Sequence, residues 1–138
     1  AWAEEQKEPC ILWYQSRAVG DKLAEHGIPV YGAGNNPPEK GPTCAMSIRA
    51  HGVGKNLQHG WRSQLILEPP SSGTIWEQLL GRTHRPGQEA DTVEAHVYCH
   101  TPPFARALKS AKEDAQYIEQ STGSRQKLVY CVYGGALI

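Results

Sequence analysis

The residues best suited to chemistry lie in one run just past the middle of the chain, from Gln78 to Gln88. This run contains two arginines, Arg82 and Arg85, and opens with the side-chain amide of Gln78. A guanidinium keeps its proton and presents a rigid fork of N–H donors, which matches the charged oxygens of a phosphate. The run therefore indicates a site for a phosphorylated ligand, and two such forks favour a triphosphate.

A helix is expected to position these side chains. Thr74 and Glu77 have the spacing of a capping box, so the helix is expected to start at Ile75. Pro86 and Gly87 are expected to end it, because proline cannot continue a helix and glycine follows helix ends.

On such a helix Gln78, Arg82 and Arg85 stand at i, i+4 and i+7 and share one face. The alternative is an exposed helix whose arginines are only solvated, because surface charges often have no further role.

A second stretch of interest follows the expected buried strand Thr43–Ser47 and contains Gly52, Gly54, Lys55 and Asn56. Glycines after a strand let backbone N–H groups approach a phosphate closely, and a helical turn that begins at Lys55 would favour an anion at its N-terminus. The stretch is interpreted as a phosphate-contacting loop. The alternative is an ordinary turn, since the third glycine of a dinucleotide-binding fingerprint is absent.

These stretches carry a family resemblance. The pattern Gln78-x-x-Gly-Arg82-x-His84-Arg85-x-Gly87-Gln88 closely resembles motif VI of superfamily-two helicases, in the form found in Swi/Snf-like translocases. Residues 48–57 resemble motif V, and residues 11–31 resemble the opening of the second RecA-like lobe, motif IV included. The motifs occur in this order, and the resemblance covers nearly the whole chain.

The resemblance implies that residues 1–138 are a helicase C-terminal domain, an α/β three-layer RecA-like lobe with a mainly parallel sheet flanked by helices. In such enzymes ATP with Mg²⁺ lies between two lobes. The resemblance then implies that Arg85 is the arginine finger and Arg82 its neighbour on the phosphates, with Gln78 as a polar contact and Gly54 as a backbone element near the nucleotide.

Contacts with the DNA backbone are the second implied activity. The candidates are Ser47, Arg49, Lys55 and Asn56, in and around the motif V stretch. His51 stands where the family commonly has glycine, which is a departure from the pattern.

The sequence contains neither a Gly-x-x-x-x-Gly-Lys-Ser/Thr phosphate loop nor the acidic motif that holds magnesium in these ATPases. A first ATPase lobe is therefore expected on the same polypeptide or on a partner chain, and the isolated chain is expected to be inactive. Two alternatives stay open: a non-catalytic protein-interaction module with this fold, and a lobe of an RNA helicase.

Composition sets the remaining expectations. Fourteen basic and fourteen acidic side chains cancel, so any binding to nucleic acid has to come from a local patch. No apolar run approaches the roughly 20 residues that span a bilayer, and the polar start is unlike a signal peptide, so an intracellular protein, cytoplasmic or nuclear, is expected. Four cysteines without a Cys-x-x-Cys pair indicate reduced core thiols, and no metal site is predicted.

Hydrophobic periodicity predicts the elements that position these stretches. The expected strands are residues 10–14, 28–31, 43–47, 63–67, 92–99 and 127–133. The expected helices are residues 17–26 with Ser16 as the cap, 75 to about 85, and 103 to about 120. The apolar stripe of the last helix consists of Phe104, Ala107, Leu108, Ala111, Ala115 and Ile118. Gly32 to Pro42 is expected to be a surface loop because glycine and proline interrupt it, whereas members of the family usually carry a further helix there.

Overall fold

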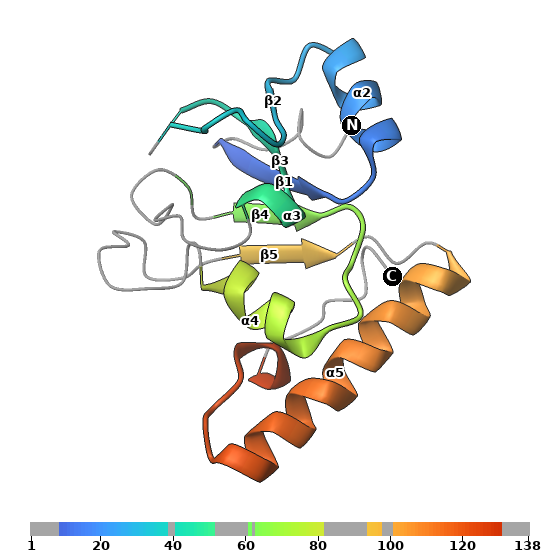
Figure 1. The fold of residues 1–138 in the computed structure, drawn as a ribbon, viewed down its shortest axis with the longest axis vertical. Helices are drawn as coiled ribbons and strands as arrows, with labels where there is room; N and C mark the ends of the chain where they lie inside the picture. The colour runs from blue at the N-terminus through green and yellow to red at the C-terminus, as the bar shows by residue number, and fades with distance from the viewer. Residues whose placement is uncertain are drawn as a thin grey trace.

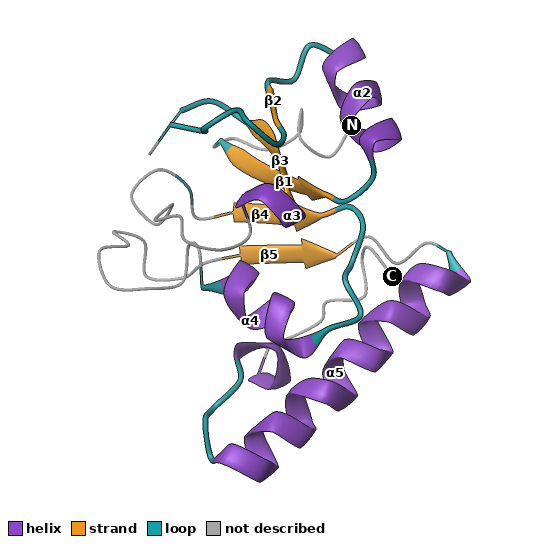
Figure 2. Cartoon of the chain, viewed as in Figure 1, coloured by secondary structure: helices purple, strands orange, loops and turns teal. Residues whose placement is uncertain are grey.

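The computed structural model describes residues 9–38, 41–51, 61, 63–81, 94–97 and 101–130. Its elements are β1 (Cys10–Tyr14), α2 (Arg17–Glu25), β2 (Val30–Tyr31), β3 (Cys44–Ser47), α3 (Ile48–His51), β4 (Ser63–Ile66), α4 (Gly73–Leu80), β5 (Glu94–Val97), α5 (Pro102–Thr122) and the 3-10 helix η1 (Lys127–Tyr130). The five strands form one parallel sheet in the order β2-β3-β1-β4-β5 (Figure 1, Figure 2). The predicted α/β fold with a parallel sheet is confirmed.

Strand β1 is the centre of the sheet, paired with β3 on one side and β4 on the other. Leu12 stands opposite Ala45 of β3 and Leu65 of β4. All five residues of β1 are buried, and a continuous apolar run of this kind is typical of a strand covered on both faces. The strand is also where the sequence places it.

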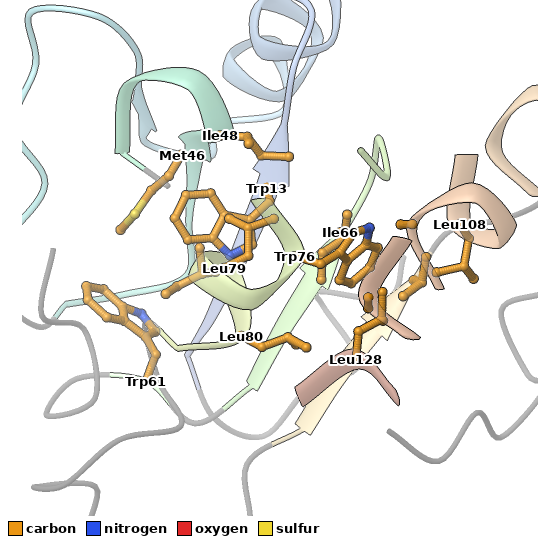
Figure 3. Packing of buried hydrophobic residues seen from close by; sticks show 14 of the residues in the cluster. Trp13, Met46, Ile48, Trp61, Ile66, Trp76, Leu79, Leu80, Leu108 and Leu128 are labelled. Atoms are coloured by element: carbon orange, nitrogen blue, oxygen red, sulfur yellow. The ribbon is translucent and has the colours of Figure 1, made fainter. Parts of the chain in front are cut away.

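Helices cover both faces of the sheet, and β1 divides its side chains between them because successive residues point to opposite faces. Leu12 and Tyr14 pack with Val19 and Leu23 of α2. The opposite face carries the larger cluster, which includes Ile11, Trp13, Met46, Ile66, Trp76, Leu79, Leu108, Ala111 and Leu128 (Figure 3). That cluster draws on α4, α5 and η1, so the molecule has three layers.

Helix α4 begins two residues before the expected start, and the predicted capping box is wrong. The N-cap is Ser72, whose hydroxyl accepts a hydrogen bond from Ile75 N at 3.4 Å. The carboxylate of Glu77 is instead bound to Lys127. The local sequence pattern was present, but a partner from the far end of the chain competes for the carboxylate.

The same helix ends earlier than expected, at Leu80, with Gly81 as its C-cap and Gly81 N donating to Glu77 O at 3.1 Å. Arg82 and Arg85 lie outside the described residues, so the face predicted to be shared by Gln78, Arg82 and Arg85 stays a prediction. Glycine is among the poorest helix formers, so a helix end here agrees with its propensity. Pro86 and Gly87, the predicted stop, lie outside the described residues.

The last predicted strand is also wrong where it is described, because residues 127–130 form the 3-10 helix η1. The apolar pattern was read correctly as buried, since Leu128 is in the core. Its burial occurs against α4 and α5, and Lys127 N donates to Glu77 instead of to a strand. Residues 131–133 lie outside the described residues.

Helix α3 was not expected at Ile48–His51, and the remaining elements differ from expectation only in length. Helix α2 is capped by Ser16 as predicted, and α5 buries Leu108, Ala111 and Ala115 of its expected apolar stripe. Strands β2, β3 and β4 are shorter than predicted, as is the described part of β5.

The described part of the chain contains two of the four cysteines. Cys10 and Cys44 are buried, and burial raises the pKa of Cys44 to about 12, so this thiol is protonated at neutral pH. Within the described ranges there is no group of three or more His, Cys, Asp or Glu side chains placed to hold a metal ion, and no helix long and apolar enough to cross a membrane.

Candidate nucleotide and nucleic-acid site

The carboxyl ends of the central strands meet at one edge of the sheet. Tyr14 at the end of β1 stands opposite Ser47 at the end of β3, and Trp13 stands opposite Ile66 at the end of β4. The loops that follow Ser47 and Leu67 therefore open on the same edge (Figure 1). Ligands of open α/β sheets bind beyond this edge.

Glu68 joins the loop after β4 to the loop after β1 through hydrogen bonds. Its Oε1 accepts hydrogen bonds from Gln15 N at 2.8 Å, Ser16 N at 2.8 Å and Ser16 Oγ at 3.1 Å. Gln15 Nε2 in turn donates to Glu68 O at 2.7 Å. A carboxylate suits this position because it faces the N-terminus of α2. No local sequence signal marks this role of Glu68, since its partners are 52 and 53 residues away in the chain.

Ser47 and Arg49 lie where β3 passes into α3. Ser47 Oγ accepts a hydrogen bond from Ala50 N at 3.3 Å, so its hydroxyl caps the helical turn. Ile48 is buried, whereas Arg49 is exposed. The helical turn after β3 thus begins at Ile48, before the glycines. The turn expected at Lys55 and Asn56 lies outside the described residues, as does Gly54.

His51 is buried, with 3% of its surface exposed. Its Nε2 lies 2.9 Å from Gly32 O, and a carbonyl only accepts, so Nε2 carries the proton. Nδ1 is buried and has no hydrogen-bond partner within the described part of the chain. The residue that departs from the family pattern therefore links α3 to the end of β2.

Helix α4 starts near the carboxyl edge and runs back beneath β5, so its last turn lies towards the start of that strand (Figure 1). Gln78 is half-buried in this last turn, between residues whose side chains fix the helix. Leu79 and Leu80 are buried in the same core as Trp61, which precedes β4 (Figure 3). The end of α4 is thus held against the sheet.

The two arginines directly follow this fixed end. Gly81 is the last residue described before them, and Arg82 and Arg85 themselves lie outside the described residues.

Comparison with known proteins supports the fold. No protein-family model and no curated protein match the chain. Among solved structures, the chain is similar to "Crystal structure of the C-terminal part of Fun30 ATPase domain", with a TM-score of 0.58 and 16% sequence identity. The match covers 76% of this chain and 39% of that one, so the chain spans well under half of the length of its neighbour. At this identity the likeness shows a shared fold.

Proposed function

We propose that the chain is the C-terminal RecA-like lobe of an ATP-dependent DNA helicase or translocase of the Swi/Snf-like kind. In this proposal a first lobe holds ATP and Mg²⁺, and this lobe supplies Arg85 and Arg82 to the phosphates. Gln78 and Gly54 complete the nucleotide side of the cleft. Ser47, Arg49, Lys55 and Asn56 contact the DNA backbone.

One observation carries the proposal: the motif VI pattern begins in the last turn of a core helix, in a fold shared with the C-terminal part of a Fun30 ATPase domain. Leu79 and Leu80 bury one side of that turn, while Gln78 beside them is half-buried. The buried side chains of Leu79 and Leu80 fix the helix end shortly before Arg82, which fits a function that requires accurately positioned arginines.

The chemistry follows from the charge that develops during phosphoryl transfer. Negative charge spreads over the transferring group, and an arginine supplied across a cleft stabilises it more in the transition state than in bound ATP. The lobe thus acts on a nucleotide held mostly by its partner, which agrees with the missing phosphate loop.

The isolated chain is expected neither to hydrolyse ATP nor to bind it tightly, and adding the first lobe is expected to restore DNA-stimulated hydrolysis. The measurement is ATP turnover by the purified chain and by the intact two-lobed protein, each with and without duplex DNA. Turnover by the isolated chain that Arg85→Ala abolishes would contradict the two-lobe proposal. An intact protein that binds no nucleotide would support the interaction module, and stimulation by RNA alone would support the RNA helicase.

A second expectation concerns DNA. Arg49→Ala and Lys55→Ala in the intact enzyme should weaken binding about equally across DNA sequences, because a phosphate contact carries no sequence information. Each should also flatten the dependence of log affinity on log salt concentration by about one unit per lost contact. Titrations at several salt concentrations measure this slope.

Arg17→Ala is the matched control for Arg49→Ala, because Arg17 is also exposed, at the start of α2, and has no assigned contact with DNA here. It should leave the slope unchanged. A sequence-selective loss of affinity, or an unchanged slope for Arg49→Ala, would count against a backbone contact.

A further inference from the structure

The last turn of α4 is bound to the C-terminal segment of the domain by a charge-assisted contact. Glu77 Oε1 lies 2.8 Å from Lys127 Nζ, and Glu77 Oε2 accepts a hydrogen bond from Lys127 N at 2.7 Å. The pair is only partly exposed, with 33% of the Lys127 side chain and 27% of the Glu77 side chain accessible. Both carboxylate oxygens are thus engaged by one residue, which fixes the direction of the side chain as well as its position.

The same turn contains the helix end. Gly81 N donates to Glu77 O at 3.1 Å, so residue 77 holds Lys127 with its side chain and the C-cap with its backbone. Arg82 is the next residue after that cap. A shift of Glu77 would therefore move the end of α4, which Arg82 follows directly in the sequence after Gly81.

Lys127 is itself held in place. Gln126 N donates to Glu119 Oε1 of α5 at 3.1 Å, and Leu128 is buried beneath α4 and α5 with 1% of its surface exposed (Figure 3). At the opposite end of α4, Gly73 N donates to Asp114 Oδ2 at 2.7 Å. Helix α5 and the segment after it therefore contact both ends of α4, through the carboxylate of Asp114 at the start and that of Glu77 in the last turn.

The small free energy expected from the Glu77–Lys127 ion pair favours a role in positioning over a role in folding stability. Partly exposed ion pairs add little to folding stability, because solvent screens them and the long side chains lose entropy. A displacement of about 1 Å at a reacting group, in contrast, lowers a rate on the order of a hundredfold. Loss of this contact should thus be far more visible in catalysis than in unfolding.

We propose that Glu77 and Lys127 are a positioning pair: the C-terminal segment holds the end of α4 so that Arg82 and Arg85 reach the phosphates. The inference rests on the proposed function. In the intact two-lobed enzyme, Glu77→Ala should lower kcat by up to about a hundredfold. Lys127→Ala, which keeps the backbone hydrogen bond, should lower kcat about tenfold. Lys127→Arg should retain most of the activity because its charge still reaches the carboxylate.

Binding measurements distinguish positioning from simple loss of structure. ADP with aluminium fluoride mimics the transferring phosphoryl group, so its affinity should fall by about the same factor as kcat, while the affinity for ADP and for DNA stays within about twofold. A merely structural role would reduce the fraction of active enzyme and leave the ratio of the two nucleotide affinities unchanged. Lys109→Ala is the control, since Lys109 is an exposed lysine of α5, and it should change neither kcat nor that ratio.

Arg85→Ala is measured in parallel to separate the two proposals. If Arg85→Ala keeps near-normal kcat, the proposed function itself fails. If Arg85→Ala abolishes hydrolysis but Glu77→Ala and Lys127→Ala, both folded, keep kcat within twofold, the positioning inference is overturned. If Glu77→Ala does not fold, Lys127→Ala and Lys127→Arg decide the question, because both leave the Glu77 carboxylate and its backbone partner in place.

Discussion

Replacing Arg85 by alanine in the intact two-lobed enzyme should abolish DNA-stimulated ATP hydrolysis. An arginine finger is worth on the order of 10³ to 10⁵ in kcat, because its guanidinium meets charge that develops only in the transition state. The affinity for ATP should stay within about tenfold, since most ground-state contacts belong to the first lobe. Steady-state kinetics and a nucleotide titration on the same variant measure both quantities.

Arg85→Lys should restore little of the activity, because a lysine ammonium is a point charge and does not reproduce the planar fork of donors. Arg125→Ala serves as the control, because Arg125 is exposed in the turn after α5, far along the chain from the motif. Near-normal kcat in a folded Arg85→Ala enzyme would leave the arginines as solvated surface charges and favour the interaction module.

Gly73→Ala should destabilise the domain by about 1–3 kcal/mol, the usual cost of overpacking a core. A Cβ at this position would lie 2.8 Å from Ala115 N, 3.1 Å from Ala111 O and 3.1 Å from Ala115 Cα. These are backbone atoms of α5, which cannot rotate away, so the two helices would have to separate. The gain in helix propensity, at most about 1 kcal/mol, is too small to offset this clash.

Urea unfolding of Gly73→Ala and of the control Gly41→Ala tests this expectation. Among the described residues a Cβ at Gly41 would meet only Pro38 Cγ, at an ordinary 3.4 Å, so the control should unfold near the wild-type midpoint. Separation of α4 from α5 would also strain the hydrogen bond between Gly73 N and Asp114. An unchanged midpoint for Gly73→Ala would mean that α5 yields easily, and that α4 is held less firmly than its contacts indicate.

The sequence by itself was sufficient for the fold class and for the central strand. Cys10–Tyr14 was predicted over the residues that β1 occupies, because a short continuous apolar run next to a capped helix depends on local composition alone. Ser16 as the cap of α2 and the buried face of α5 were predicted for the same reason: residues close together in sequence produce them.

The motif VI pattern was likewise evident from residue types and spacing, whereas the end of the helix that contains its first residues was not. The helix was expected to continue through Arg85, but α4 ends at Leu80. Hydrophobic periodicity predicts which residues are buried better than it predicts where a helix ends, because the end also depends on the conformation of the residues that follow.

Only the tertiary structure decided which distant groups meet. Glu77 had the spacing for a local capping box, yet its carboxylate is bound by Lys127, 50 residues away. Glu68 joins the loops after β1 and β4 across 52 residues, and Lys127 to Tyr130 pack as a 3-10 helix although their apolar pattern favoured a strand. The physical reason is common to all three. A buried polar group forms its hydrogen bond with whichever suitable partner lies near it in the folded molecule. Local sequence spacing does not predict partners that come from another layer of the molecule.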